Sequence, residues 1–327
     1  MAGKTPLVVV TRRLPEGIEQ KLCDSFDTRL NAADVPLDAE AMKAAVATAE
    51  VLVPTVTDRV GAEIIAAAGP QLKLIANFGV GYNHIDVKAA AARGIAVTNT
   101  PGVLTDATAD IAMTLMLAVT RRAIEGARLL QAGQFAGWCP TWLMGVGLRG
   151  RKLGIAGMGR IGEAMARRSK PFGLEIHYHN RKRAPAKIED ELGARYWESL
   201  DAMLPEMDIV SLNCPYTAET YRLMSAERLA RMKASAYLIN TARGEIVDER
   251  ALAEALAEGR LAGAGLDVFE HEPRVEPQLL TLANVALLPH LGSSTIEARM
   301  GMGKKVIANI AAFATGRALP DPITPPA

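Results

Sequence analysis

Short apolar runs alternate with alanine-rich, helix-forming segments along most of the chain. Over the first hundred residues, compact apolar runs predict buried strands at 7–10, 51–53, 72–76 and 95–97. Helix-forming composition at 38–49 and 61–68 lies between some of these runs. Strand and helix in regular succession predict a parallel sheet that is covered by helices on both faces.

A second series of apolar runs begins after residue 150. It predicts six strands, at 152–156, 175–179, 209–212, 237–240, 265–269 and 285–288. Helical patterns separate several of them, at 161–170, 226–232 and 249–257, and a last helix is expected at 294–315. Six strands with intervening helices are typical of a doubly wound sheet of the dinucleotide-binding (Rossmann) type.

A long helix is predicted between the two series, from Thr105 or Asp106 to about Gln131. The first half of its sequence, ADIAMTLMLAVTRRAIEGARLL, is apolar around most of the helix circumference. Such a helix is too apolar to face water, so we expect it to be buried between domains or against a second copy of the chain. A homodimer formed through 105–131 follows from this interpretation.

Composition and charge exclude several classes of protein. Hydrophobic residues make up 49% and charged residues 22%, which excludes wholesale disorder, and 327 residues suffice for two domains. Lys and Arg total 37 against 36 Asp and Glu, which gives no general attraction to nucleic acid or an anionic membrane. The apolar helical stretch 111–119 is far shorter than the roughly 20 residues of a membrane span. We therefore expect a cytoplasmic protein with no nucleic-acid or membrane partner.

The cysteines and histidines predict neither a disulfide framework nor a metal centre. Cys23, Cys139 and Cys214 are widely spaced and form no CxxC pair, which is consistent with a reducing compartment. His177 and His179 would share one face of a strand, but a third metal ligand is missing nearby. We expect no bound metal.

A glycine-rich turn follows the predicted strand at 152–156 and leads into a predicted helix. Its sequence, GMGRIG, comprises Gly157, Met158, Gly159, Arg160, Ile161 and Gly162. The first glycine permits a tight turn, the second lets the backbone approach a pyrophosphate, and the third lets helix and strand pack closely. The N–H groups at the start of the helix can bind phosphate. A tight turn without a ligand is the alternative, and the strand–turn–helix context argues against it.

The residues after the second strand of this series bear on the choice of dinucleotide. An acidic residue about 20 positions past the glycines would accept hydrogen bonds from the ribose hydroxyls. Asn180 takes that place here, and Arg181, Lys182 and Arg183 follow it. An amide tolerates a ribose 2′-phosphate that a carboxylate would repel, and arginine can bind this phosphate with two hydrogen bonds. NADP(H) is therefore favoured over NAD(H), and a solvated basic loop is the alternative interpretation.

Three ionisable residues follow predicted strands, at the edge where α/β proteins build their active sites. Arg243 lies in NTARGEIVDE, Glu272 in GLDVFEHEP and His290 in PHLGSST. Singly, they could be a surface ion-pair partner, a loop carboxylate and an interior histidine with satisfied hydrogen bonds. Together, they supply a carboxylate-binding cation, a proton donor and a group that holds the donor charged. This set matches carbonyl reduction by a dinucleotide.

These blocks resemble the signature sequences of the D-isomer-specific 2-hydroxyacid dehydrogenase family, in order and at suitable spacing. Earlier in the chain, NFGVGYNHID at 77–86 resembles the family's substrate-carboxylate loop, and NTPGVLTDATAD at 99–110 resembles its interdomain connection. The segment GWCPTWLMGVGLRGRKLGIAGMGRIG is most similar to the glyoxylate/hydroxypyruvate reductase branch. The resemblance implies an α/β fold with two lobes. A dinucleotide-binding domain, 101–291, would be inserted into a smaller flavodoxin-like substrate-binding domain, 1–100 plus 292–327.

The resemblance also implies roles for single residues. His290 would protonate the ketone oxygen, Glu272 would orient the imidazole and favour its charged form, and Arg243 would bind the carboxylate and polarise the carbonyl. The substrate contacts that it implies are the backbone N–H groups of Val80 and Gly81, together with Arg243, His290 and, from a neighbouring subunit, Trp138. The further cofactor contacts are Asn213, Cys214, Pro215, Thr241, Asp267 and Gly292.

The leading hypothesis is an NADPH-preferring reductase that converts glyoxylate, hydroxypyruvate or a similar small 2-oxo acid into the D-2-hydroxy acid. A dehydrogenase for bulkier D-2-hydroxy acids differs from it only in pocket volume. A dinucleotide-sensing regulatory protein of the corepressor type would carry the same blocks. That alternative is disfavoured because the sequence shows no disordered tail or basic patch for recruiting partners.

Overall fold

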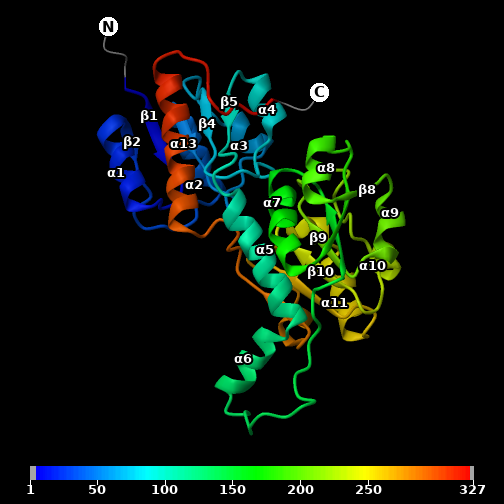
Figure 1. The fold of residues 1–327 in the computed structure, drawn as a ribbon. Coiled ribbons are helices and arrows are strands. Elements are labelled where there is room, and N and C mark those ends of the chain that lie inside the picture. The colour runs from blue at the N-terminus through cyan, green and yellow to red at the C-terminus, as the bar shows by residue number, and fades with distance from the viewer. Residues whose placement is uncertain (1–4, 325–327) are drawn as a thin grey trace. The chain divides into compact units, whose positions relative to one another are not determined.

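The computed structural model describes residues 5–324, which form two compact units (Figure 1). The first unit takes the chain up to Leu104 and again from Ser294, and the second is the segment Thr105–Ser293. The boundaries expected from the sequence, after residues 100 and 291, lie a few positions away. The assignment of one domain to the substrate and the other to the dinucleotide stays a prediction. Among the described residues, no helix is long and apolar enough to cross a membrane.

The first unit is built on a five-stranded parallel sheet with the strand order β2-β1-β3-β4-β5. Its strands are β1 Leu7–Val10, β2 Asp27–Arg29, β3 Val51–Val53, β4 Leu74–Ala76 and β5 Ala96–Thr98. Every residue of β3 and β4 is buried, as expected for strands that are covered on both faces. The strand order is that of flavodoxin-like folds, which agrees with the predicted fold class. The hydrophobic pattern did not predict β2, because this short edge strand has no buried residue.

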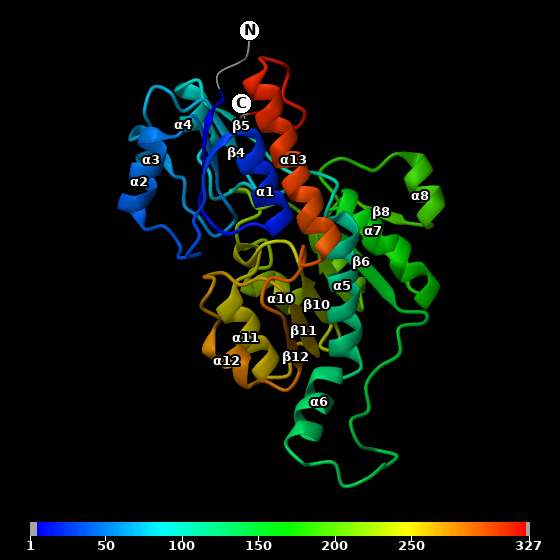
Figure 2. The same ribbon diagram turned by 90° about the vertical axis from the view of Figure 1, so that its left-hand side faces the viewer.

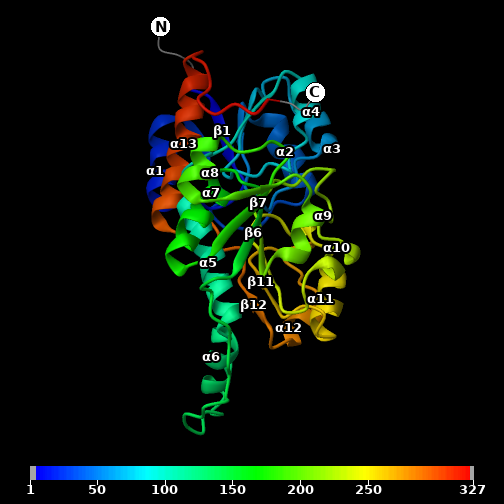
Figure 3. The ribbon, with the colours of Figure 1, turned by 45° about the vertical axis from the view of Figure 1, so that its right-hand side comes forward.

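Helices cover both faces of this sheet. They are α1 Glu16–Ser25, α2 Ala39–Thr48, α3 Ala62–Ala66, α4 Val87–Ala92 and α13 Ile296–Ala314. Helices α1 and α13 lie side by side (Figure 3), where Gly303 leaves room for the side chain of Ile18 that a Cβ would overlap. Met302, Val306 and Ile310 of α13 are buried in the same apolar cluster as β1. The final helix therefore completes the core of the unit in which the chain begins.

The second unit holds a seven-stranded parallel sheet in the order β12-β11-β10-β9-β6-β7-β8. Its strands are β6 Lys152–Ala156, β7 Glu175–His179, β8 Arg195–Trp197, β9 Ile209–Leu212, β10 Tyr237–Asn240, β11 Gly263–Leu266 and β12 Val285–Leu287. The strand order reverses between β6 and β9, which is the topological switch point of a doubly wound dinucleotide-binding fold. The predicted α/β Rossmann class is confirmed. The predicted six strands were one too few, because the edge strand β8 is short and has no fully buried residue.

Helices and 3₁₀ turns connect these strands. They are α5 Thr105–Thr120, α6 Ala123–Gln131, α7 Arg160–Ser169, η1 Lys170–Phe172, α8 Ala186–Leu192, α9 Leu200–Met203, η2 Leu204–Glu206, α10 Ala226–Arg231, η3 Gly244–Ile246, α11 Glu249–Ala257 and α12 Pro277–Thr281. The predicted helices at 161–170, 226–232 and 249–257 correspond to α7, α10 and α11. One apolar cluster packs α5 and α7 on the sheet, and a second packs α9, α10 and α11 on it.

The prediction of one long helix over 105–131 is wrong, because the structure contains two helices there. Helix α5 ends at Thr120, and Arg122 has a φ of 54°, a left-handed conformation that an α-helix cannot continue through. Helix α5 packs against β10, β11 and β12 of its own unit (Figure 2). Glycines in β11 permit this approach, since a Cβ on Gly265 would lie 2.8 Å from the Cβ of Leu115. The apolar character of α5 is therefore explained without a second subunit.

The same contact explains why the observed strand begins and ends earlier than the strand predicted over 265–269. Strand β11 runs from Gly263 to Leu266, and its two glycines carry no apolar signal in the sequence. They are selected by the close approach of α5 rather than by hydrophobicity. The chain leaves the sheet at Asp267, so Phe269 belongs to the loop that follows the strand.

Helix α6 and the segment after it stand away from the sheet in all three views (Figures 1, 2 and 3). Helix α6 has no buried residue. Large apolar side chains are exposed here: Leu130, Phe135, Trp138, Trp142 and Met144. Exposed apolar side chains gathered on one segment are typical of an interaction surface. The homodimer stays a prediction, and this segment is a better candidate for its interface than α5.

Candidate active site

The glycine-rich turn lies at the switch point of the second sheet, between the carboxyl ends of β6 and β9. Gly157 has a φ of 102°, and a Cβ there would lie 2.5 Å from the backbone nitrogen of Cys214. A Cβ on Gly162 would overlap the carbonyl oxygen of Gly157. At Gly159, in contrast, a Cβ would meet nothing within 4 Å. Two glycines are thus required by the protein's own packing, whereas the third borders open space.

This open space has the chemistry that a dinucleotide needs. Gly159 is the N-cap of α7 and provides no side-chain cap, so N–H groups of the first turn can donate to a phosphate. Two buried oxygens near the same strand ends, Asn213 Oδ1 and Thr241 Oγ1, have no hydrogen-bond partner among the described residues. Unsatisfied buried polar atoms are rare and often mark a place where a ligand completes the hydrogen bonds. The residues present therefore fit a nicotinamide dinucleotide.

The basic segment after β7 divides into two parts. Arg183 forms an ion pair with Glu189 at 2.8 Å, and the hydrogen bonds of Arg183 and Tyr178 hold the pKa of Glu189 below its usual value. Arg181 and Lys182 are exposed and form no ion pair within residues 5–324. The amide of Asn180 donates to the carbonyl of Lys182 and so shapes the turn. The structure leaves two of the three predicted cations available for a phosphate.

Arg243 lies at the carboxyl end of β10, where the chain turns into η3. Its carbonyl accepts a hydrogen bond from Asn240 Nδ2 at 2.9 Å, and its guanidinium donates to the carbonyl of Ala242 at 2.7 Å. Burial lowers the pKa of Arg243, and the carboxylates of Glu245 and Glu272 oppose this change. The guanidinium is therefore partly desolvated and lies within electrostatic reach of Glu272, as the predicted site requires.

Glu272 and His290 lie together, although 18 residues separate them in the sequence. The distance between Glu272 Oε2 and His290 Nδ1 is 2.8 Å, and Glu272 Oε1 accepts a hydrogen bond from the backbone N–H of Phe269 at 3.1 Å. Burial raises the pKa of Glu272, but the hydrogen bonds from His290 and Phe269, together with the nearby charges of His290 and Arg243, outweigh it, and the net pKa lies below the usual value. An ionised carboxylate only accepts hydrogen bonds, so Nδ1 is the donor and Nε2 is left for another partner. Both side chains are about one-third exposed and can be reached from solvent.

Asp267 holds the backbone around His290. Its carbonyl accepts the N–H of His290, and its carboxylate accepts the N–H groups of Leu291 at 2.6 Å and Gly292 at 2.7 Å. His290 has a φ of 55°, a conformation that costs energy for a residue with a side chain. The buried carboxylate of Asp267 therefore stabilises the strained turn that presents the imidazole. The predicted contact of Asp267 with the cofactor stays a prediction, as do those of Cys214, Pro215 and Gly292.

The loop that contains Val80 and Gly81 lies in the first unit, after β4. The side-chain amide of Asn77 donates to the carbonyls of Gly79 and Gly81, and that of Asn99 donates to the carbonyl of Val80. No hydrogen bond is formed by the N–H groups of Val80 and Gly81 within residues 5–324. With its carbonyls tied back, the loop offers backbone donors of the kind that bind a carboxylate. The predicted substrate contacts of Val80 and Gly81 stay predictions.

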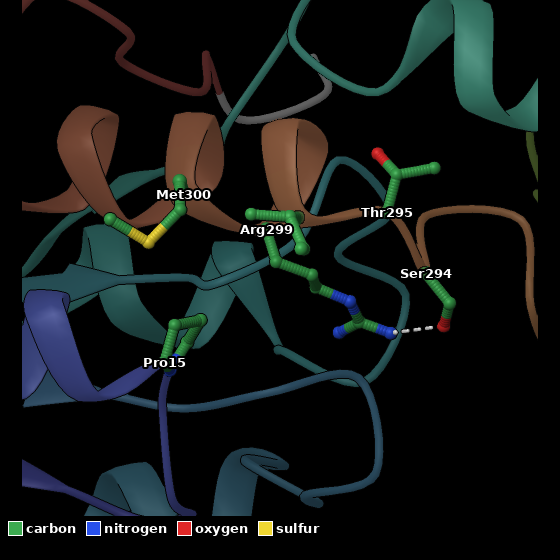
Figure 4. A pocket seen from close by; sticks show the side chains of 6 residues that line it. Pro15, Ser294, Thr295, Arg299 and Met300 are labelled. Atoms are coloured by element: carbon green, nitrogen blue, oxygen red, sulfur yellow. Dashed lines mark hydrogen bonds between the residues drawn. The ribbon is translucent and has the colours of Figure 1, made fainter.

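The first unit contains a depression of about 350 Å³ at the start of α13, lined by Pro15, Ser294, Thr295, Ile296, Arg299 and Met300 (Figure 4). Arg299, which the sequence motifs did not single out, donates there to Ser294 Oγ at 3.3 Å, and burial lowers its pKa.

In the described part of the chain, no group of three or more potential metal ligands gathers at one place. Trp138 is 84% exposed, and its predicted role in a neighbouring subunit's pocket stays a prediction.

Comparison with known protein sequences connects this site to a family. The sequence profile of the D-isomer specific 2-hydroxyacid dehydrogenase family, NAD binding domain, matches residues 113–292. The glyoxylate reductase of Thermococcus litoralis is 45% identical over 320 residues, which cover 97% of this chain and 96% of that protein. The glyoxylate reductase of Korarchaeum cryptofilum is also 45% identical, over 319 residues that cover 97% and 95% of the two chains.

Solved structures agree with these relatives. The NADPH-dependent glyoxylate/hydroxypyruvate reductase of Sinorhizobium meliloti, in complex with NADP and malonate, matches with a TM-score of 0.88 and 36% identity. The match covers 98% of this chain and 97% of that one. A glyoxylate reductase from Paecilomyes thermophila matches with a TM-score of 0.86 and 33% identity over 98% of both chains.

Proposed function

The chain belongs to the D-isomer-specific 2-hydroxyacid dehydrogenase family, and on this premise we propose that it reduces glyoxylate, hydroxypyruvate or a similar small 2-oxo acid to the D-2-hydroxy acid with NADPH. Membership makes the protein an NAD(P)-dependent oxidoreductase. The names of its relatives and the NADP in a related structure support the finer proposal. The observation that carries it is the hydrogen bond between Glu272 and His290. This bond lies at the sheet edge that also holds Arg243 and the glycine-rich turn.

His290 acts as the general acid in this proposal. Its Nδ1 is engaged by Glu272, so Nε2 carries the proton that is transferred to the carbonyl oxygen of the substrate. The lowered pKa of Glu272 keeps the carboxylate ionised at neutral pH, and it remains ionised until the pH falls to that lowered value. With Nδ1–H donated to Glu272, the imidazolium is the form that also carries a proton on Nε2, and it is therefore the form that can donate to the substrate.

Arg243 binds and polarises the substrate in this proposal. A guanidinium keeps its charge even when burial lowers its pKa, because its ordinary value is far above neutrality. It can donate to the carboxylate and to the carbonyl oxygen of a 2-oxo acid, which lie next to one another in the substrate. Negative charge that develops on the carbonyl oxygen is then stabilised by a donor already in place.

The dinucleotide supplies the hydride that reduces the carbonyl carbon. The first turn of α7 would bind its pyrophosphate, and Asn213 Oδ1 and Thr241 Oγ1 would accept hydrogen bonds that the protein alone leaves unmade. Arg181 and Lys182 would bind the 2′-phosphate that distinguishes NADPH from NADH.

The identity of the product tests the proposed function. Incubation of the protein with NADPH and hydroxypyruvate is expected to yield D-glycerate, because the family acts on the D isomer. Chiral chromatography of the reaction mixture measures this directly. L-glycerate from hydroxypyruvate, or the absence both of glycerate from hydroxypyruvate and of glycolate from glyoxylate, would contradict the proposal.

The cofactor preference predicts the effect of Arg181→Ala. Loss of a charge-assisted hydrogen bond to phosphate is expected to weaken NADPH binding about 10- to 100-fold, and NADH binding should stay close to that of the wild type. Arg195→Ala is the matched control, because Arg195 is an exposed arginine on the neighbouring strand β8 that packs over Trp197. Fluorescence titration gives both dissociation constants. Equal losses for the two dinucleotides would show that the segment is only a solvated basic turn.

A further inference from the structure

Glu249 is a buried acid whose carboxylate binds a neighbouring loop rather than the helix that it begins. It is the first residue of α11 and is 8% exposed. The cap of this helix is Asp248, which accepts the N–H of Ala251 at 3.1 Å. An acidic residue in a first helical turn ordinarily interacts with the helix's own N–H groups. Glu249 instead turns its carboxylate away from the helix, toward the loop that follows β11.

The two oxygens of Glu249 bind the two ends of this loop. Oε2 accepts the backbone N–H of Glu270 and Oε1 accepts that of Glu276, both at 2.6 Å. Between these ends, the N–H of Arg274 donates to the carbonyl of His271 and closes a turn. A carboxylate that is removed from water is costly unless it is hydrogen-bonded, and two backbone donors offset that cost. The loop 270–276 is thus closed on one side chain.

The loop held in this way is the one that carries Glu272. Glu272 lies between the two anchored residues, and its carboxylate reaches His290 at 2.8 Å. A chain of direct contacts therefore runs from Glu249 to the loop, from the loop to Glu272, and from Glu272 to the imidazole. Glu249 is far from the sequence motif that contains Glu272, so only the fold brings them together.

An arginine balances part of the negative charge around Glu249. Arg222 pairs with the carboxylates of Glu270 at 3.0 Å and of Asp248 at 3.2 Å, on the residues adjoining the loop and the helix start. The loop has three carboxylates, of which Glu270 pairs with Arg222, Glu272 contacts His290 and Glu276 lies at the far end of the loop. One arginine thus balances part of the negative charge that gathers where the loop meets α11.

We propose that Glu249 is a positioning residue for the reductase: it ties both ends of the loop 270–276, so that Glu272 stays where it orients His290. This inference rests on the proposed function. Glu249 forms no hydrogen bond or ion pair with His290 or Arg243 within residues 5–324, and the hydrogen bonds that it does form connect it to the imidazole through the loop and Glu272. It should therefore alter proton transfer and leave dinucleotide binding almost unchanged.

Glu249→Gln tests the proposal with little change in shape. The amide would turn an NH₂ group toward one of the two backbone donors, which releases one end of the loop. Misplacement of a catalytic group by about 1 Å can cost on the order of 100-fold, so we expect kcat to fall about 10- to 100-fold. The affinity for NADPH should not change, so the loss should fall on kcat and not on dinucleotide binding. Glu254→Gln, an exposed position on the same helix, is the matched control.

A double-variant comparison separates positioning from a general loss of structure. Once Glu272→Gln has removed the carboxylate that acts on His290, adding Glu249→Gln should cause little further loss of kcat. A role confined to stability would instead lower activity by the same factor in both backgrounds. Equal factors, or a Glu249→Gln protein with the kcat of the wild type, would overturn the proposal.

Hydrogen exchange provides a readout that needs no catalysis. In the wild-type protein, the amides of Glu270 and Glu276 should exchange slowly, and in Glu249→Gln the exchange of the loop should be faster than in Glu254→Gln. Fast exchange at both amides in the wild type would overturn the proposal even if the variant failed to fold. If the wild type reduced no 2-oxo acid, the proposed function would fail, and the exchange rates would still decide whether Glu249 holds the loop.

Discussion

Replacing His290 by alanine is expected to lower kcat for 2-oxo acid reduction about 10²- to 10⁴-fold, the usual cost of removing a general acid. The physical reason is that Nε2 is the donor left available once Nδ1 is bound to Glu272. The imidazole is about one-third exposed, so its removal leaves no large cavity in the core. The affinity for NADPH and the melting temperature should therefore stay close to those of the wild type.

Steady-state kinetics measure this effect, and fluorescence titration with NADPH measures whether the dinucleotide site is intact. A variant that retained a kcat within about threefold of the wild type would rule out His290 as the proton donor.

Gly159→Ala is expected to weaken NADPH binding without lowering the stability of the folded protein. An added Cβ meets no protein atom within 4 Å, and the φ of −94° suits any residue, so the fold can accept the methyl group. The same open space is where the pyrophosphate would approach the backbone. Overpacking by a methyl group costs about 1–3 kcal/mol, which corresponds to a roughly 5- to 150-fold loss of affinity.

Two further glycines make this prediction specific. Gly162→Ala should lower both stability and affinity, because its Cβ would overlap the carbonyl oxygen of Gly157. Gly147→Ala should change neither, since a Cβ there also meets nothing within 4 Å and the residue lies outside the turn. Thermal unfolding and NADPH titration on the three variants distinguish these outcomes. An unchanged affinity in Gly159→Ala would show that the open space is not the phosphate site.

The strand–turn–helix that bears the glycine motif could be predicted because its signals are local. Strand β6 and the start of α7 follow from an apolar run and a glycine pattern within about ten residues. The order of strands in each sheet also agrees with the predicted class. The strand and the glycine turn depend on neighbours in the sequence, and one sequence is enough to find them, whereas the strand order follows from the class and not from local signals.

The features that the sequence did not reveal depend on contacts between distant residues. The break at Arg122 could not be predicted, because nothing in the helical pattern of TRRAI marks a left-handed residue. The predicted position of strand β11 was wrong because its glycines are required by close packing against α5, about 150 residues earlier in the chain. The sequence does not distinguish Arg183 from Arg181 and Lys182, because the ion pair between Arg183 and Glu189 forms only in the folded chain.

The site shows the same division. Arg243, Glu272 and His290 could be selected by their positions after strands and by the family's motifs. Their arrangement could not, because the left-handed turn at His290 and the carboxylate of Asp267 that stabilises it appear only in the folded chain. The two hydrogen bonds of Glu249 were likewise hidden, since an acid that begins a helix is ordinary in a sequence.

The most direct test of the account is a set of initial rates. Oxidation of NADPH and of NADH should be followed with glyoxylate, hydroxypyruvate, pyruvate and a branched 2-oxo acid. We expect fast turnover of the two smallest acids with NADPH and slower turnover with NADH or with the branched acid. Tight binding of NADPH with no turnover of any of the four acids would contradict the account, and would favour a dinucleotide-sensing role for this fold.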